Sequence, residues 1–209
     1  HVALKRDGKT VNLAGRVLVT AEDGGLLVLT RDGVLWQVLP QELVKQTKDE
    51  TPFEPLSQEE LAEKILAGLP QGFRVYSTKH HYLIFYNTSR GYAEWCGSLF
   101  EGLYKAFTNF WTRKGFKLAE PEFPLVAIVF ADQRSYAEHS RAEIGDGAKS
   151  MIGYFNLLTN RMTMYDLTGT TSGGRAPARG SMAAEINRVL SQPDAERVAY
   201  GQHPAVLAH

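Results

Sequence analysis

The longest regular pattern in the chain is helical and covers residues 88–114. Apolar side chains recur there every three or four positions, basic residues occupy the last turn, and Gly115 follows as a stop signal. The pattern predicts a long amphipathic helix. Its apolar stripe consists of Tyr92, Cys96, Leu99, Leu103, Phe107 and Phe110.

Short apolar runs on both sides of this helix predict strands, and the run at 124–130 is apolar enough for a central strand. A second helix is expected at 132–142. The alternation predicts an α+β domain built on a mixed twisted sheet with packed helices. Its strands are expected at 73–78, 81–87, 124–130, 151–157 and 161–167, the last two as a hairpin.

A small antiparallel β meander is expected in residues 1–44. Asp-Gly pairs begin at Asp7, Asp23 and Asp32, and such pairs favour tight hairpin turns because they tolerate positive φ. The strands are expected at 16–20, 26–30 and 34–38. So small a sheet is marginal alone in water, so we expect it to pack on the larger domain or on a partner, with an oligomer formed through this module as one possibility.

The meander and the larger domain are expected to be joined by a linker at 45–56, which is charged and contains two prolines. The larger domain then runs from 57 to 209. It opens with a short helix, because Ser57 and Glu60 fit a capping box. Residues 168–180 are expected to form a flexible loop, and Ser181 to cap a last helix that covers at least 182–190.

Composition narrows the functional classes. The 209 residues carry 23 basic and 23 acidic side chains, so no charge excess favours nucleic acid as a partner. The sequence contains no run of 18 or more apolar residues, so no membrane span is predicted. Cys96 is the only cysteine, which excludes an internal disulfide and a thiolate zinc cluster.

Three runs carry a family resemblance: HHYLIFYNTSRGYAEWCGSLFEGLYKAFTNFWTRKGFKL, PLVAIVFADQRSYAEH and GYFNLLTNRMTMYDL. From residue 73 to about 197 the chain resembles a bacterial, largely planctomycete domain family of unknown function and of zinc-peptidase type. The resemblance implies a gluzincin-like fold, in which an edge strand over the cleft precedes a helix that carries His-Glu-x-x-His and binds zinc. Export to the periplasm or cell surface is implied by the resemblance alone.

The chain departs from that pattern at its end. After ERVA, where the resemblance implies the metal-binding helix, the sequence reads YGQHPAVLAH. His203 and His209 are weak metal candidates because six helical residues separate them by roughly 240°. Three explanations fit: the sequence stops before the helix, it joins segments that are not contiguous, or the site has been lost. We expect no catalytic metal in this chain, and zinc only where a His-Glu-x-x-His segment is present in the full protein.

The hairpin at 151–167 is the best candidate for a binding site. A free sheet edge can add an extended peptide as another strand, and the resemblance implies that the edge strand aligns a substrate. The candidate residues are Gly153, Tyr154, Phe155 and Asn156. The alternative is an ordinary hairpin paired on both sides.

For the remaining histidine and aromatic residues, the sequence favours structural roles. No carboxylate is near His80 and His81 in sequence, which favours a structural pair, and His139 is expected on a solvated helix surface. Helical spacing favours a core role for the aromatic residues Trp95, Phe100, Tyr104, Phe107, Phe110 and Trp111. No catalytic residue is predicted.

Two functions follow as expectations. One is a truncated or inactive relative of a zinc metallopeptidase, with a cleft and edge strand suited to extended peptide. The other is a non-enzymatic scaffold or protein-interaction domain at the cell envelope.

Overall fold

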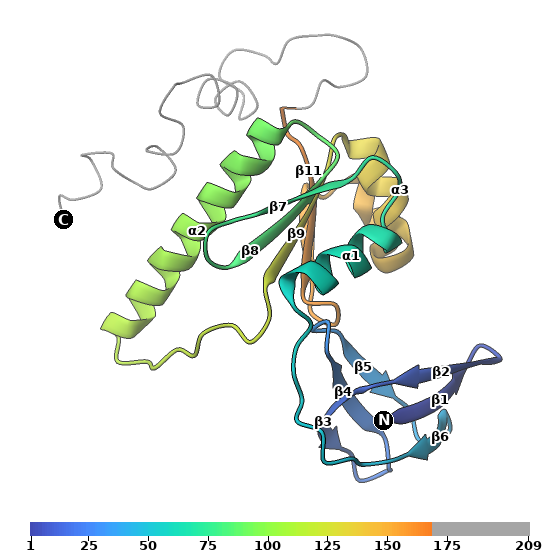
Figure 1. Ribbon diagram of the computed structural model, residues 1–209. Coiled ribbons are helices and arrows are strands. Elements are labelled where there is room, and N and C mark those ends of the chain that lie inside the picture. Colours follow the sequence, from blue (N-terminus) through green and yellow to red (C-terminus); the bar gives the residue numbers. More distant parts are fainter. Residues whose placement is uncertain (169–209) are drawn as a thin grey trace. The chain divides into compact units, whose positions relative to one another are not determined.

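The computed structural model describes residues 1–168, and the chain divides into two compact units (Figure 1). One unit comprises His1–Glu63 with Asn156–Asn160, and the other comprises Lys64–Phe155 with the chain from Arg161 onward. The expected architecture, α+β with an N-terminal antiparallel meander, is confirmed. The loop expected at 168–180 and the helix expected from 182 lie, apart from Thr168, outside the described residues.

The N-terminal unit contains six strands in two three-stranded sheets. The predicted meander is the sheet β3-β4-β5, with β3 at Gly15–Thr20, β4 at Leu26–Thr30 and β5 at Leu35–Val38. The second sheet has the order β2-β1-β6, with β1 at Val2–Arg6, β2 at Lys9–Leu13 and β6 at Leu43–Gln46. Asp7 and Gly8 both have positive φ, 51° and 74°, in the turn between β1 and β2.

Both sheets contribute to one core, so the meander finds its partner layer within its own unit. The second sheet forms because Val2 and Leu4 alternate with exposed or half-buried residues and present one apolar face. Each such side chain contributes roughly 1.5–3 kcal/mol when fully buried. The core residues are Val2, Leu4, Leu13, Leu26, Val28 and Val38.

Helix α1 spans Gln58–Gly68 and begins with the predicted capping box. The backbone N–H of Ser57 donates to the Glu60 carboxylate at 2.9 Å, and the N–H of Glu60 donates to the Ser57 hydroxyl at 3.2 Å. These two bonds satisfy backbone donors that the first helical turn leaves unpaired.

A five-stranded sheet organises the second unit, with the order β10-β11-β9-β8-β7. Strands β8, β9 and β11 run parallel, and β7 is antiparallel to β8. The strand bounds are Arg74–Ser77 for β7, Tyr82–Tyr86 for β8, Leu125–Phe130 for β9, Gly153–Asn156 for β10 and Arg161–Tyr165 for β11.

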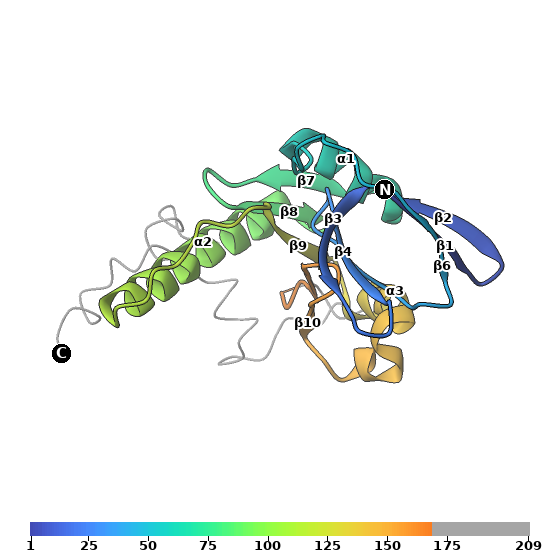
Figure 2. The same cartoon turned by 90° about the horizontal axis from the view of Figure 1, so that it is seen from below.

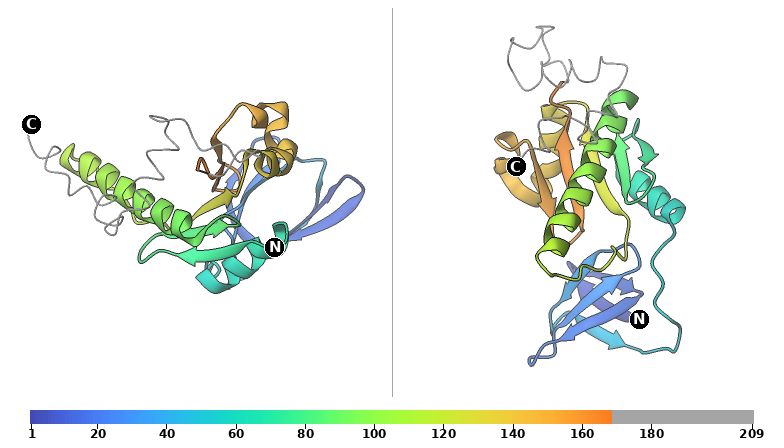
Figure 3. Two further views of the ribbon diagram at one scale, coloured as in Figure 1. Left: turned by 90° about the horizontal axis from the view of Figure 1, so that it is seen from above. Right: turned by 90° about the vertical axis from the view of Figure 1, so that its left-hand side faces the viewer.

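Helices α2, Arg90–Arg113, and α3, Gln133–Ile144, cover opposite faces of this sheet (Figure 3). The face under α2 presents Ile84 and Val129, and the face under α3 presents Phe130, because successive strand residues point to opposite sides. Ser89 and Asp132 cap the two helices, each accepting a backbone N–H three residues ahead. A 3-10 helix at Gly145–Lys149 follows α3.

Only the first half of α2 is buried. Its buried residues end at Glu101, so the prediction of a core role is wrong for the exposed Phe107 and Phe110. The physical reason is length: a helix of 24 residues spans about 36 Å, whereas strands of five or six residues span about 17–20 Å. No helix within residues 1–168 is both long and apolar enough to cross a membrane.

Candidate functional site

Strand β10 lies at the end of the five-stranded sheet (Figure 2). It pairs with β11 on one side, and residues 1–168 place no strand on its other side. The outer side of such a strand presents backbone N–H and C=O groups that a further strand can pair with.

Gly153 shapes this edge. A Cβ atom at this position would lie 2.8 Å from the Met164 Cβ and 2.8 Å from the Thr163 carbonyl oxygen. Atoms this close cannot coexist without a backbone shift, so the absence of a side chain lets β10 approach β11.

Tyr154 anchors the strand to α3. Its hydroxyl donates to the Glu143 carboxylate at 2.8 Å, and its ring lies 6.3 Å from the fully buried ring of Tyr136. Burial raises the pKa of Tyr154, so the hydroxyl stays protonated and can donate this bond at neutral pH.

Phe155 points away from α3, because neighbours in a strand face opposite sides, and it is 53% exposed. Met151 and Ile152, just before β10, are exposed as well. The Asn156 side chain instead accepts backbone N–H groups from Leu158 and Thr159 at 2.9 and 3.2 Å. Phe155 is therefore the predicted residue best placed to touch a ligand, while Asn156 shapes the turn.

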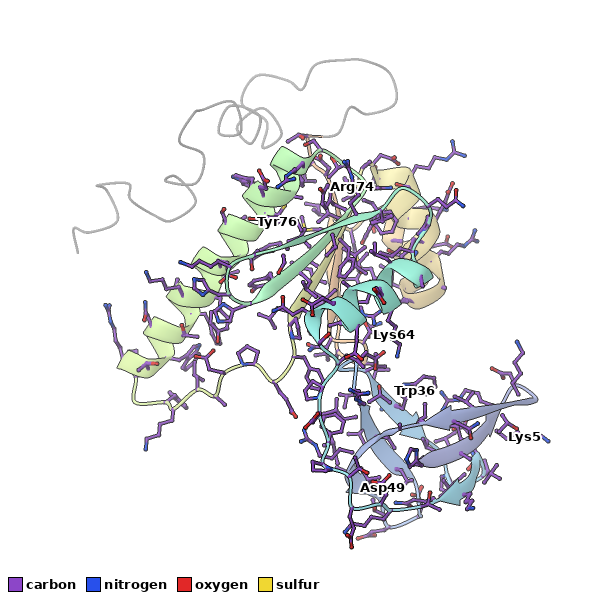
Figure 4. All side chains as sticks on the ribbon, viewed as in Figure 1. Lys5, Trp36, Asp49, Lys64, Arg74 and Tyr76 are labelled. Carbon is purple, nitrogen blue, oxygen red and sulfur yellow. The ribbon has the colours of Figure 1, made fainter. Side chains whose placement is uncertain are left out.

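The opposite edge of the sheet, β7, differs in chemistry. Arg74 begins the strand and its guanidinium lies 5.2 Å from the ring centre of Tyr86 (Figure 4). A charged residue on an edge strand disfavours pairing with another chain. Val75, the exposed apolar residue of β7, is 37% exposed and offers a natural comparison for Phe155.

A buried carboxylate also contacts a histidine on the α2 side of the unit. Glu101 is 6% exposed and accepts hydrogen bonds from the Thr78 hydroxyl at 2.6 Å and from the His81 backbone N–H at 2.7 Å. Its second oxygen lies 2.7 Å from His81 Nδ1. Burial raises the pKa of Glu101, but the bonds from His81 and Thr78 outweigh burial and leave that pKa below its usual value.

These contacts select one form of the His81 ring. An ionised carboxylate only accepts, so Nδ1 carries a proton and donates it to Glu101. The ring of Tyr104 lies 3.9 Å from the His81 ring, and Nε2 lies 3.6 Å from the Glu120 carboxylate. The Tyr104 hydroxyl donates to the same carboxylate at 3.1 Å.

Sequence reasoning missed this pair. His81 and Glu101 are 20 positions apart, and only the packing of α2 on the sheet brings them together. The sequence signal that could have revealed the pair is the position of Glu101 within an amphipathic helix, since a buried charge needs a partner. The arrangement fastens the turn before β8 to α2, because Thr78 and His81 both bind Glu101.

The described residues do not fit a zinc centre. Residues 1–168 hold no group of three histidine, cysteine or acidic side chains arranged for a metal ion. His139, expected on a solvated surface, is instead half-buried with its ring 4.9 Å from that of Phe130, and burial lowers its pKa. His203 and His209 lie outside the described residues.

Comparison of the chain with protein-family models, with curated proteins and with solved structures finds no match.

Proposed function

We propose that the α+β unit is a peptide-binding module of zinc-metallopeptidase type, which takes up an extended peptide as a sixth strand beside β10. The observation that carries the proposal is the position of β10 at the end of the sheet. The family type rests on the three resembling runs and remains part of the proposal. The 209-residue chain is expected to bind such peptides and to leave them uncleaved.

Backbone pairing would supply affinity that is largely independent of peptide sequence. Each added hydrogen bond contributes roughly 0.5–1.5 kcal/mol net, and a four-residue strand offers only a few. Burial of Phe155 against an apolar peptide side chain would add roughly 1.5–3 kcal/mol. After the cost of ordering the peptide, a dissociation constant on the order of 0.1 mM is expected.

Selectivity would come from the apolar side chains that flank the edge. Because strand residues alternate, a peptide with apolar residues at every second position would meet Phe155 and expose its other side chains. The preferred ligand is therefore an extended segment of alternating apolar and polar residues. A folded protein that hides such segments should bind poorly.

The test is fluorescence anisotropy of a short labelled casein peptide with the full 209-residue chain. Phe155→Asp should weaken binding by about tenfold or more, because it replaces apolar burial with a charge. Val75→Asp, at the other sheet edge, is the matched control and should bind as the unchanged chain does. Circular dichroism confirms that both variants fold.

A second peptide separates backbone pairing from side-chain contact. Methylation of alternate backbone nitrogens removes hydrogen-bond donors and leaves the side chains in place, so it should abolish binding. The proposal fails if the methylated peptide binds equally well, or if the two aspartate variants weaken binding equally. Mass spectrometry of the recovered peptide distinguishes binding from cleavage.

A further inference from the structure

The second half of α2 presents an apolar stripe that the described residues leave exposed. This half of the helix extends beyond the strands of its sheet (Figure 1). The members of the stripe are spaced by three or four residues, so they share one side of the helix, and each is between 40% and 63% exposed: Leu99, Leu103, Phe107 and Phe110. A helix in a globular protein normally buries such a stripe, so this one is a candidate interaction surface.

Aromatic rings extend the stripe beyond the helix. The centre of the Trp111 ring lies 5.3 Å from that of Phe110 and 5.1 Å from that of Phe116, which is itself exposed. The same ring lies 6.1 Å from that of Phe107. These contacts join the stripe and Phe116 into one contiguous apolar surface, and a surface of this kind marks an interaction site, whereas scattered apolar residues do not.

The size of this surface is sufficient for a weak dimer. A large apolar side chain has an accessible area of about 200 Å², and the four stripe residues and Phe116 are each about half exposed, so one copy of the chain would bury about 500 Å². Two such surfaces that cover each other would bury about 1,000 Å² in total. This area is at the lower limit for a specific interface between proteins.

Charge favours a second copy of the chain as the partner. The stripe itself contains no ionisable side chain, so it offers no charge that would select an oppositely charged partner. The full chain has 23 basic and 23 acidic residues, so two copies can approach each other without net repulsion.

The order of residues along the stripe favours antiparallel pairing. Leucines occupy its first half and phenylalanines its second half, so an antiparallel partner places Leu99 opposite Phe110 and Leu103 opposite Phe107. Larger and smaller side chains then face each other along the whole stripe, which favours close packing. Parallel pairing would instead place ring against ring and bring the two copies of Lys114 together. Antiparallel pairing is also the arrangement that a two-fold axis perpendicular to the helices produces.

We propose that two copies of the chain form a two-fold symmetric dimer, in which the exposed halves of their α2 helices pack antiparallel. Because the interface is small, a dissociation constant on the order of 10 μM is expected. The proposal is independent of peptide binding at β10, because the stripe belongs to α2 and β10 lies at the sheet edge.

Sedimentation equilibrium of the full 209-residue chain tests the dimer. Phe107→Glu should weaken association by about tenfold or more, because it places a charge at the centre of an apolar interface. Asn109→Glu is the matched control: Asn109 is exposed and lies about 200° further around α2 than Phe107, so the same charge there should leave association unchanged. Circular dichroism confirms that both variants fold. A chain that stays monomeric at about ten times the expected constant, or equal weakening by both variants, overturns the proposal.

Disulfide formation between chains with one introduced cysteine each tests the orientation of the helices. Positions 99 and 110 lie about 16 Å apart along α2, and antiparallel packing brings position 99 of one copy beside position 110 of the other. A mixture of Leu99→Cys and Phe110→Cys chains should therefore form mixed disulfides at least tenfold faster than either variant forms disulfides with itself, because cysteines whose Cα atoms are more than about 7 Å apart cannot be bridged. The native Cys96 is buried and should stay unreacted. A preference for disulfides within each variant, or no preference, overturns the antiparallel dimer.

Discussion

Replacement of Glu101 by alanine should strongly destabilise the α+β unit. The Glu101 carboxylate accepts three hydrogen bonds, from Thr78 and from two nitrogens of His81, while it is 6% exposed. Alanine would leave all three donors without this acceptor. Its effect therefore measures what the buried pair contributes.

The magnitude follows from the burial of the partners. Hydrogen bonds to a charged group contribute roughly 1.5–3 kcal/mol each, but the three do not add, because one acceptor serves all of them. The His81 side chain is 23% exposed, so water can satisfy part of what is lost. We expect Glu101→Ala to lower the free energy of unfolding by roughly 2–4 kcal/mol, because partly buried donors lose a charged acceptor.

Glutamine at position 101 should be much milder. Its oxygen can still accept from the Thr78 hydroxyl and the His81 backbone, while its amide group would face Nδ1. The His81 ring can then accept from this amide at Nδ1 and carry its proton on Nε2, which faces the Glu120 carboxylate 3.6 Å away. A loss of roughly 1–2 kcal/mol is expected, together with a change of tautomer.

Urea denaturation followed by helical circular dichroism measures these losses, and nitrogen NMR of the imidazole reports the tautomer. Glu94→Ala is the matched control on the same helix, because Glu94 pairs with Arg90 at the surface, where such pairs add little to stability. Equal destabilisation by the Glu94 and Glu101 substitutions would refute the assignment. An unchanged His81 tautomer in the glutamine variant would refute the predicted ring switch.

Three further predictions concern titration and close packing. The pKa of Glu101 is lowered in the folded chain, so its stabilising effect is present above the usual glutamate pKa and is lost as pH falls. The difference in unfolding free energy between the unchanged chain and the Glu101→Gln variant should therefore narrow below about pH 4 in an acid titration. The hydrogen bonds from Arg6 and from the Leu39 N–H lower the pKa of Glu42 to about 2. Glu42→Gln should therefore reduce the melting temperature of the N-terminal unit at neutral pH, and it should have no effect once the Glu42 carboxylate is protonated. Gly153→Ala should cost roughly 1–3 kcal/mol in urea denaturation, because its methyl group would collide with the β11 backbone; a neutral result would show that β10 can move away without loss.

Local patterns predicted the elements of the fold well, because local physics determines them. The Asp-Gly pairs predicted the β3-β4-β5 meander, and the Ser57 and Glu60 spacing predicted the start of α1. Each of these signals acts within a few residues. The second sheet of the N-terminal unit was missed because β6 joins β1 across about 40 positions, and its residues 43–46 lie at the predicted boundary between meander and linker.

The candidate site, too, contains features that local sequence patterns predicted and features that they did not. Spacing and turn signals predicted the hairpin that contains β10, but they did not predict that Tyr154 would anchor to α3 or that Asn156 would shape the turn. Those roles depend on which helix covers which face of the sheet. The bond between Glu101 and His81 depends on the same packing, so residue type at each position alone could not reveal it.

The exposed half of α2 explains why the prediction of a core role was wrong for Phe107 and Phe110. Apolar spacing correctly identified one continuous stripe, but the spacing carries no information on how long the covering layer is. Tyr92 and Cys96 of the stripe are buried in the core, whereas the stripe is exposed from Leu99 onward. Helical spacing therefore identifies which residues share one side of a helix, whereas the layer that covers each of them depends on the length and position of the sheet.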